Sequence, residues 1–114
     1  MSRALGSTIF GVMKIATWNV NGLRAVHKKD FLKWLGDEKA DIVCLQEIKL
    51  SGEHVEAEPI LKNPMKYGSH WHYAEKAGYS GLAIYAKKDP DEVRKGLGVE
   101  QFDREGRWLE TDLG

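Results

Sequence analysis

Two predicted strands separated by a helical stretch constrain the fold of this chain more than any other feature. Lys14–Asn21, which reads KIATWNVN, alternates in polarity as a β-strand does, because Ala16, Trp18 and Val20 share one side. The run Asp41–Leu45 is nearly all apolar, which is typical of a strand buried on both faces. Strand, helix and strand within about 30 residues predict a βαβ unit with parallel strands and a right-handed crossover.

The stretch between these strands predicts an amphipathic helix. Its apolar side chains recur at helical spacing, at Leu23, Val26, Phe31, Leu32 and Leu35. Charged residues lie between them and are expected to face solvent. We expect a break near Lys28–Asp30, with Asp30 placed to cap the second piece.

Four polar residues are expected to meet where the parallel strands end. Asn19 and Asn21 close the first strand on one face, and Gln46 and Glu47 follow the second strand. The carboxyl ends of parallel strands lie at one edge of a sheet, where ligands bind in open α/β sheets. One carboxylate beside two amides suits Mg²⁺, which prefers one or two carboxylates and keeps much of its water.

Simpler interpretations of the same residues stay open at this point. Asn is favoured in turns and disfavoured within strands, so Asn19 and Asn21 are equally placed to cap the turn that follows. Glu47 is equally placed as a solvated strand end or as an ion-pair partner of Lys49.

A hairpin is predicted further along the chain. His70–Tyr73 and Leu82–Lys88 alternate as two antiparallel strands, and Gly78 and Gly81 ease the turn between them. The two histidines of the first strand share a face, but no third metal ligand lies nearby in the sequence. Surface histidines are therefore favoured over a metal pair.

The remaining segments complete an α/β pattern that leaves one sheet face open. Val55–Leu61 predicts a short helix interrupted by Pro59, and Glu92–Leu97 and Arg107–Leu113 predict weak strands. Turns are expected at 89–91 and 103–106. The predicted architecture is one mixed β-sheet with helices on one face. Since the apolar strands need cover on both faces and no second set of helices or strands is predicted, we expect an incomplete domain.

Composition narrows the class of protein. With 114 residues, 42% hydrophobic and 30% charged, the chain is the size and type of one small globular domain. Its formal net charge is zero, which argues against a generally basic nucleic-acid binder and leaves room for a local basic face. No apolar run approaches the roughly 20 residues of a membrane span. The single cysteine, Cys44, is expected to be a buried free thiol in a reducing compartment, the cytoplasm.

The first twelve residues are expected to lie outside the fold. MSRALGSTIFGV has one Arg and no sustained apolar core, so it does not have the pattern of a secretory signal. A second methionine, Met13, directly precedes the first strand. We interpret 1–12 as a leader or tag-like extension and 13–114 as the domain.

Four motifs in order resemble one nuclease family. WNVNGLRA, DIVCLQEIK, WHYAEKAGYSGLAIY and FDREGRWLETDLG closely resemble the N-terminal half of exonuclease III and, more broadly, the AP endonucleases of the endonuclease/exonuclease/phosphatase superfamily. LQE alone is shared across the superfamily, whereas the combination is specific to the exonuclease III branch. The resemblance implies half of a four-layer α/β sandwich, in which the absent half supplies the sheet that covers the open face.

The resemblance implies a DNA repair activity and a set of site residues. The family cleaves the DNA backbone 5′ to abasic sites and removes nucleotides from 3′ ends of double-stranded DNA, with Mg²⁺ or Mn²⁺ as cofactor. Catalytic roles are implied for Asn19, Asn21, Glu47 and Lys49, with Asn19 and Glu47 at the metal. DNA-backbone contacts are implied for Arg24, Ala25, Lys29, Gly78 and Tyr79.

Other catalytic groups of that family have no counterpart in this chain. By resemblance, an Asp-x-Asn pair, a catalytic tyrosine and a terminal Asp-His couple come from the C-terminal half. Here no Asn follows Asn63 and no His follows His72. We therefore expect these 114 residues alone to be inactive or nearly so.

Two other functions are weighed against this one. The first is a half-domain that self-associates to cover its open sheet face, with a structural, DNA-binding or metal-binding role and no turnover. The second is another superfamily enzyme, such as an inositol phosphatase or a sphingomyelinase, against which GYSGLAIY and NGLRA argue.

Overall fold

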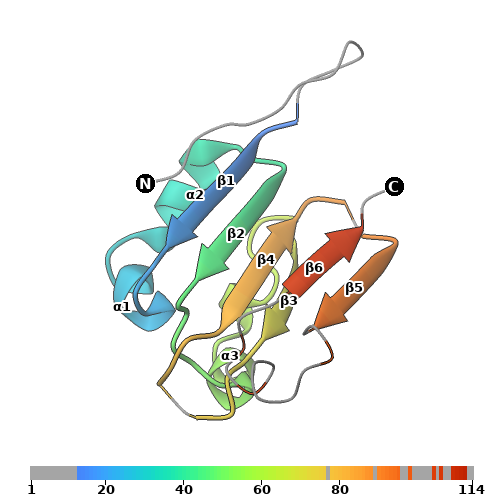
Figure 1. Ribbon diagram of the computed structural model, residues 1–114. Helices are drawn as coiled ribbons and strands as arrows, with labels where there is room; N and C mark the ends of the chain where they lie inside the picture. The colour runs from blue at the N-terminus through green and yellow to red at the C-terminus, as the bar shows by residue number, and fades with distance from the viewer. Residues whose placement is uncertain are drawn as a thin grey trace.

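The computed structural model describes residues 13–76, 78–88, 90–95, 98, 104, 106 and 109–112. The predicted extension 1–12, and parts of the turns predicted at 89–91 and 103–106, lie outside the described residues. The elements in chain order are β1 (Ile15–Asn19), α1 (Leu23–His27), α2 (Phe31–Glu38), β2 (Ile42–Gln46), α3 (Gly52–Ala57), η1 (Pro59–Leu61), β3 (Gly68–His72), β4 (Leu82–Ala86), β5 (Glu92–Lys95) and β6 (Leu109–Asp112) (Figure 1).

The main sheet has four strands in the order β1-β2-β4-β3. β1 and β2 are parallel, with Asn19 opposite Gln46, which confirms the predicted βαβ unit. β4 pairs antiparallel with both β2 and β3, and the β3–β4 pairing confirms the predicted hairpin. The carboxyl ends of β1 and β2 therefore lie at one edge of the sheet, together with the loop that precedes β4 (Figure 1).

The predicted helix is divided in two at the expected place. α1 ends at His27 and α2 begins at Phe31. Asp30 precedes α2, but its side chain makes no capping hydrogen bond, so that part of the prediction is wrong. Its φ of 69° is left-handed, whereas a capping residue is normally extended and directs its side-chain oxygen at the first turn.

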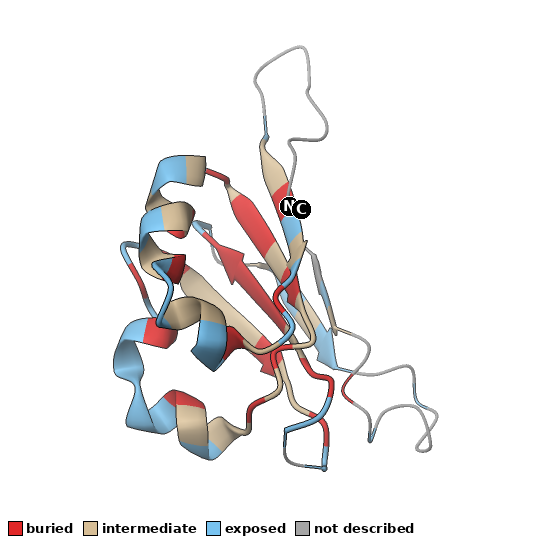
Figure 2. Cartoon of the chain, turned by 90° about the vertical axis from the view of Figure 1, so that its left-hand side faces the viewer, coloured by how far each residue is buried: buried red, intermediate tan, exposed pale blue. Residues whose placement is uncertain are grey.

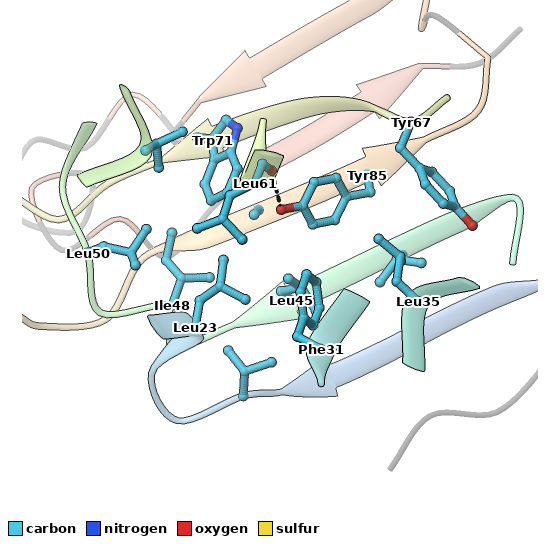
Figure 3. Close-up of a cluster of buried hydrophobic side chains, with 14 of the residues drawn as sticks. Leu23, Phe31, Leu35, Leu45, Ile48, Leu50, Leu61, Tyr67, Trp71 and Tyr85 are labelled. Carbon is cyan, nitrogen blue, oxygen red and sulfur yellow. Dashed lines mark hydrogen bonds between the residues drawn. The ribbon is translucent and has the colours of Figure 1, made fainter. Parts of the chain in front are cut away.

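Helices cover one face of the main sheet, and the hydrophobic core lies between them and the strands (Figures 2 and 3). Phe31 and Leu35 of α2 are buried against the sheet, near Leu45 and Tyr85. The Tyr85 hydroxyl donates a 2.5 Å hydrogen bond to the Leu61 carbonyl, which ties η1 to the strands. Because of this cover, Ala16 of β1 is buried while its neighbour Thr17 is exposed, whereas every residue of β2 is buried or partly buried.

The other face carries a feature that the sequence did not predict. β5 and β6 do not extend the main sheet but pair with each other as a separate two-stranded sheet. β6 contacts β4 and β5 contacts β3, so this second sheet covers part of the outer face. The prediction of one sheet with no second set of strands is wrong to this extent, because two short strands pair as readily with each other as with a sheet edge.

The thiol of Cys44 lies on the same outer face. It lines a small cavity of about 170 Å³ with Ile84 of β4 and Leu109 of β6, and it is only partly buried. The prediction of a buried thiol is therefore wrong in part, since Cys44 is free but of intermediate burial. Thr17, its register partner on β1, is exposed.

The segment between β2 and β3 forms two short helices rather than one. α3 begins at Gly52, and Pro59 starts η1, where its missing N–H costs nothing. The Ser51 N–H donates a 3.1 Å hydrogen bond to Nδ1 of His54, which fixes the start of α3. Among the residues that the structure describes, no helix has the length and apolar character required to cross a membrane.

Candidate metal and phosphate site

Three loops are joined by backbone hydrogen bonds at the carboxyl ends of β1 and β2. We call residues 20–23, 46–49 and 80–81 the loop junction. The Gly22 N–H donates to the Glu47 carbonyl at 2.8 Å, and the Leu23 N–H to the Ile48 carbonyl at 2.9 Å. These bonds extend the pairing of β1 and β2 beyond the strands and fix the start of α1 against the loop that carries Glu47.

The loop before β4 joins the same junction from the other side. The Ile48 N–H donates to the Gly81 carbonyl at 3.2 Å, and the Lys49 N–H to the Ser80 carbonyl at 2.8 Å. A Cβ at Gly81 would lie 2.8 Å from Cγ1 of Ile48, so only glycine permits this approach. The loop after β2 is thus held between its two neighbours.

Four residues of the loop junction have left-handed backbones although none is glycine. Their φ angles are 47° at Asn21, 52° at Glu47, 56° at Lys49 and 46° at Ser80. Such conformations are costly for residues with a Cβ, and they cluster at functional sites when surrounding contacts hold them in place. Here the backbone bonds of the junction supply those contacts.

The four predicted catalytic residues form one hydrogen-bonded chain. Nδ2 of Asn19 donates to Oε2 of Glu47. Oδ1 of Asn19 accepts the Asn21 N–H at 3.0 Å, and Oδ1 of Asn21 accepts from Nζ of Lys49 at 2.5 Å. Asn19, Asn21 and Glu47 are thus brought together as predicted, whereas Nε2 of Gln46 donates to the Cys44 carbonyl at 3.3 Å. Asn19 also caps the turn, as its simpler interpretation predicts.

Glu47 has one carboxylate oxygen held and one available. Within the described part of the chain, Oε1 of Glu47 has no hydrogen-bond partner, and the ammonium of Lys49 pairs with Asn21 rather than with Glu47. Lys49 and Glu47, both of which the structure describes, therefore do not form the ion pair that was the simpler interpretation of Glu47. A carboxylate that is oriented through one oxygen and open at the other is a suitable ligand for a hard cation.

The donor set fits Mg²⁺ or Mn²⁺ as a partial site. One carboxylate with nearby amides leaves most coordination positions to water or to phosphate oxygens, as Mg²⁺ prefers. No group of three or more His, Cys, Asp or Glu side chains that could hold a metal occurs among the described residues. Of the described residues, Glu47 is thus the one that could supply an anionic ligand. The described residues do not surround a metal ion with protein ligands alone.

The residues predicted to contact DNA lie on the two loops that flank Glu47. Arg24 and Ala25 are exposed on α1, and Lys29 is exposed in the turn that follows. Gly78 and Tyr79 are exposed in the β3–β4 loop, where Nζ of Lys76 lies 5.8 Å from the Tyr79 ring centroid. Both α1 and this loop meet the same end of the sheet (Figure 1).

Sequence reasoning missed the contribution of Ser80 and Gly81. The sequence predicts only that Gly81 eases a turn and assigns no role to Ser80, yet the carbonyls of both residues hold the backbone of the loop that carries Glu47. Backbone acceptors carry no side-chain signature. The only signal was a pair of nearby glycines in GYSG, which indicates a close backbone approach without indicating its partner.

The comparison with known families identifies this arrangement. Residues 16–114 match the endonuclease/exonuclease/phosphatase family. The chain belongs to this family. The resemblance inferred from WNVNGLRA, QEIK and GYSG is therefore confirmed at the level of the family.

Two relatives are named as an exodeoxyribonuclease and as a DNA repair nuclease. The chain is 50% identical over 102 residues to an exodeoxyribonuclease of Bacillus subtilis (strain 168), covering 89% of this chain and 38% of that protein. It is 45% identical over 102 residues to the DNA repair nuclease APEX1 of Danio rerio, covering 89% of this chain and 33% of that protein. The chain thus spans between about a third and two fifths of the length of these curated relatives.

Solved structures of family members share the fold. An AP endonuclease from Archaeoglobus fulgidus superposes with a TM-score of 0.74 at 28% identity, covering 90% of this chain and 37% of that chain. A 3′-5′ exonuclease (NExo) from Neisseria meningitidis gives 0.70 at 32% identity, covering 85% and 36%. The mixed sheet with its helices is therefore part of the AP endonuclease fold, as predicted.

Proposed function

We propose that this chain provides the metal-binding and phosphate-binding part of a Mg²⁺-dependent DNA repair nuclease of the exodeoxyribonuclease III type. The activity would be phosphodiester hydrolysis, as a 3′-5′ exonuclease and an abasic-site endonuclease. The observation that carries the proposal is the Asn19–Glu47 hydrogen bond at the shared end of two parallel strands. The names of the relatives, an exodeoxyribonuclease and a DNA repair nuclease, support the same reaction class.

In this proposal Glu47 is the metal ligand and Asn19 positions it. Both polar atoms of Asn19 are used within the chain, Nδ2 toward Glu47 and Oδ1 toward the Asn21 N–H. The bond from Nδ2 supports a positioning role for Asn19, and Oδ1 keeps a second lone pair for the direct ligation that the resemblance implied. When bound, Mg²⁺ or Mn²⁺ would neutralise negative charge on the phosphate or on the leaving oxygen.

Asn21 and Lys49 extend the same chain of hydrogen bonds. The Lys49 ammonium donates to Oδ1 of Asn21, so it fixes the orientation of that amide and adds a positive charge beside the site. A cation at this position attracts a phosphate oxygen by Coulomb interaction. We assign Asn21 and Lys49 to positioning the loop and the phosphate.

DNA would be held by the loops on either side of Glu47. The Arg24 guanidinium can bind a phosphate through two parallel hydrogen bonds, and Lys29 adds a point charge. Ala25 and Gly78 allow close backbone approach, and Tyr79 is exposed enough to lie against a sugar or in a groove. Because the net charge of the chain is zero, we expect binding to depend on this local surface.

The groups that the resemblance assigns to activating the attacking water have no counterpart in this sequence. Hydrolysis needs a general base or a water-orienting residue in addition to the metal ligand. We propose that such groups come from the remaining length of the whole protein, since this chain spans between about a third and two fifths of the length of its relatives. The 114-residue chain is then expected to bind metal and DNA weakly and to cleave poorly.

Paramagnetic broadening by Mn²⁺ tests the metal site. In ¹⁵N-labelled protein, Mn²⁺ should broaden amide signals around Asn21, Glu47 and Ile48 selectively. Glu47→Gln should abolish this pattern, whereas Glu53→Gln, an exposed acid on α3, should leave it intact. Equal loss in both variants, or broadening elsewhere in the parent protein, would contradict the assignment of Glu47.

Fluorescence anisotropy tests the DNA surface separately. A labelled duplex with one abasic-site analogue should bind the chain, and Arg24→Ala should weaken binding and lower the dependence of log affinity on log salt concentration by roughly one unit. Lys95→Ala, an exposed lysine on β5, is the matched control. Robust cleavage of the duplex in Mg²⁺ by the chain alone would contradict the expectation of weak activity.

A second candidate function rests on the outer face of the main sheet. Thr17 on β1 is exposed and Cys44 on β2 is partly exposed, whereas the second sheet contacts mainly β3 and β4. A second copy of the chain could cover this face and give a self-associating half-domain without turnover. Light scattering at micromolar concentration separates the candidates, because a monomer across that range would exclude self-association.

A further inference from the structure

A cavity of about 300 Å³ lies at the end of the main sheet remote from Glu47. It is formed by the end of α2, the segment before β3 and the residue after β4. Its lining residues are Leu35, Gly36, Lys39, Met65, Lys66, Tyr67 and Lys87. The β2–β4 register runs from Gln46 opposite Leu82 to Ile42 opposite Ala86. The cavity and Glu47 are thus separated by at least the length of a five-residue strand, about 13 Å or more.

The floor of the cavity is apolar and closely packed. Leu35 is fully buried, and Tyr67 is 4% exposed, with its hydroxyl donating to the Ala40 carbonyl. Gly36 lies inside α2, where glycine normally destabilises a helix. A Cβ at Gly36 would lie 3.2 Å from Sδ of Met65, so the glycine allows the methionine to approach the helix and form a wall.

Three lysines stand around this apolar floor. Nζ of Lys87 lies 5.7 Å from the Tyr67 ring centroid, and Lys39 and Lys66 are exposed at the opening. Within the described part of the chain none of the three forms an ion pair with a carboxylate. Asp41 is adjacent, since its carbonyl accepts the Lys87 N–H, and its carboxylate, which accepts the Lys14 backbone N–H at 2.8 Å, puts one negative charge beside the three lysines.

The backbone of the cavity wall is held in costly conformations. Met65 and Lys66 have positive φ angles of 52° and 125° although neither is glycine, whereas the φ of 52° at Lys39 is the usual left-handed end of a helix, here α2. Such conformations persist where surrounding contacts hold them and are a reason to look for a binding role. This strain is independent of the charge pattern and of the packing around Gly36.

We propose that this cavity binds a small amphipathic anion, with a flat apolar body on Leu35, Met65 and Tyr67 and a carboxylate, sulfonate or phosphate group facing the lysines. The volume lies at the lower end of the range of small-ligand sites, and an apolar floor with few polar groups is the usual composition of such sites. The three lysines concentrate positive charge at the cavity, although the net charge of the chain is zero. This local positive charge complements an anionic ligand. The site is separate from the proposed nuclease function.

Three probes of matched shape test the proposal by isothermal titration and ¹⁵N chemical-shift mapping. Naphthalene-2-sulfonate should bind with saturation and shift the amides of Gly36, Lys39 and Tyr67. Its neutral analogue 2-naphthalenemethanol should bind at least about fivefold more weakly, and inorganic sulfate should not saturate at the same concentrations. Shifts confined to the outer sheet face at Leu82 and Ile84 would overturn the proposal.

Substitutions at the opening provide the matched controls. Lys87→Gln should weaken naphthalene-2-sulfonate about two- to fivefold, the range of one partly exposed charge pair. Lys88→Gln changes the exposed neighbouring lysine, which does not line the cavity, and should leave the affinity unchanged. Met65→Ala, at a side chain that is 47% exposed, should weaken both aromatic probes without unfolding the protein. Equal effects of Lys87→Gln and Lys88→Gln would overturn the assigned role of the cavity lysines.

Discussion

Replacing Gly106 by alanine is the sharpest test of how the second sheet attaches to the main one. Gly106 is buried beside the end of β3 and has a φ of +60°. A Cβ at this position would lie 2.5 Å from the Ala74 nitrogen and 2.6 Å from the Tyr73 carbonyl carbon, which are both backbone atoms. The neighbouring Arg104 carbonyl accepts the Glu75 N–H at 2.8 Å, so the segment is bonded as well as packed.

The expected loss in the free energy of unfolding has two parts. An alanine in a left-handed conformation costs about 1–2 kcal/mol relative to glycine. Forcing a methyl group into a closely packed site costs about 1–3 kcal/mol more, because backbone atoms cannot turn aside as a flexible side chain does. Gly106→Ala should therefore destabilise the protein by about 2–5 kcal/mol.

Gly98→Ala is the matched control. Gly98 has a φ of +87°, but a Cβ there would meet nothing within 4 Å, so only the backbone term of about 1–2 kcal/mol applies. Urea unfolding followed by tryptophan fluorescence gives both free energies, and amide exchange at Glu75 reports the local hydrogen bond. The reasoning is refuted if the two variants lose equal stability and the Glu75 amide keeps its protection in Gly106→Ala.

Three further predictions concern the core and the surface. Tyr85→Phe should lower the free energy of unfolding by about 1–3 kcal/mol, because the buried Leu61 carbonyl loses its hydrogen-bond donor. The same substitution at the exposed Tyr79 should change it little. Equal losses for the two variants in urea unfolding would contradict this prediction. Burial raises the pKa of Tyr73 to about 12 and raises the pKa of Tyr85 further. Since these phenols lose their protons at lower pH in the unfolded chain, the free energy of unfolding should fall as the pH rises from about 10 to 12. A urea midpoint that stays constant over this range would be inconsistent with buried phenols. Lys62→Ala removes the 2.7 Å surface ion pair with Glu56 and should change the free energy of unfolding, measured with urea, by no more than about 0.5 kcal/mol. A larger loss would contradict the weak contribution expected of a solvent-exposed ion pair.

The convergence of the candidate site was predictable because strand periodicity and chain direction determine it. Alternation in β1 places Asn19 on the outer face, and the parallel crossover brings the end of β2 beside it. These are consequences of local pattern and handedness, so one sequence suffices to find them. The break between α1 and α2 was predictable for the same reason, since charged residues interrupt the apolar spacing there.

The orientation of the site residues was not predictable, because backbone conformation decides it. Nothing in the sequence indicates that Glu47 and Lys49 have left-handed φ angles or that Lys49 pairs with Asn21. The same holds for Asp30, whose residue type favours a cap and whose φ of 69° prevents it. Such angles depend on hydrogen bonds to segments about 30 residues away in the sequence.

The second sheet was missed because the short strands β5 and β6 carry little apolar signal. The four residues of β5 read EVRK, and only Val93 among them is not exposed. A strand of this kind shows its conformation through its pairing, and the pairing partner cannot be deduced from alternation alone. The partial exposure of Cys44 follows from the same uncertainty, since it depends on what lies over β2.

Because the strand order is β1-β2-β4-β3, the strands of the main sheet cannot pair in the order in which they are synthesised. β3 is synthesised before β4, yet it bonds only to β4, so it has no template until the later strand has paired with β2. The loop junction also forms late, because the Ser80 and Gly81 carbonyls can accept hydrogen bonds from the backbone of Ile48 and Lys49 only after β4 has paired with β2. Long-range pairing of this kind slows folding. During synthesis, the loop that carries Glu47 would therefore gain its contacts with Ser80 and Gly81 only after the residues of β4 have left the exit tunnel of the ribosome.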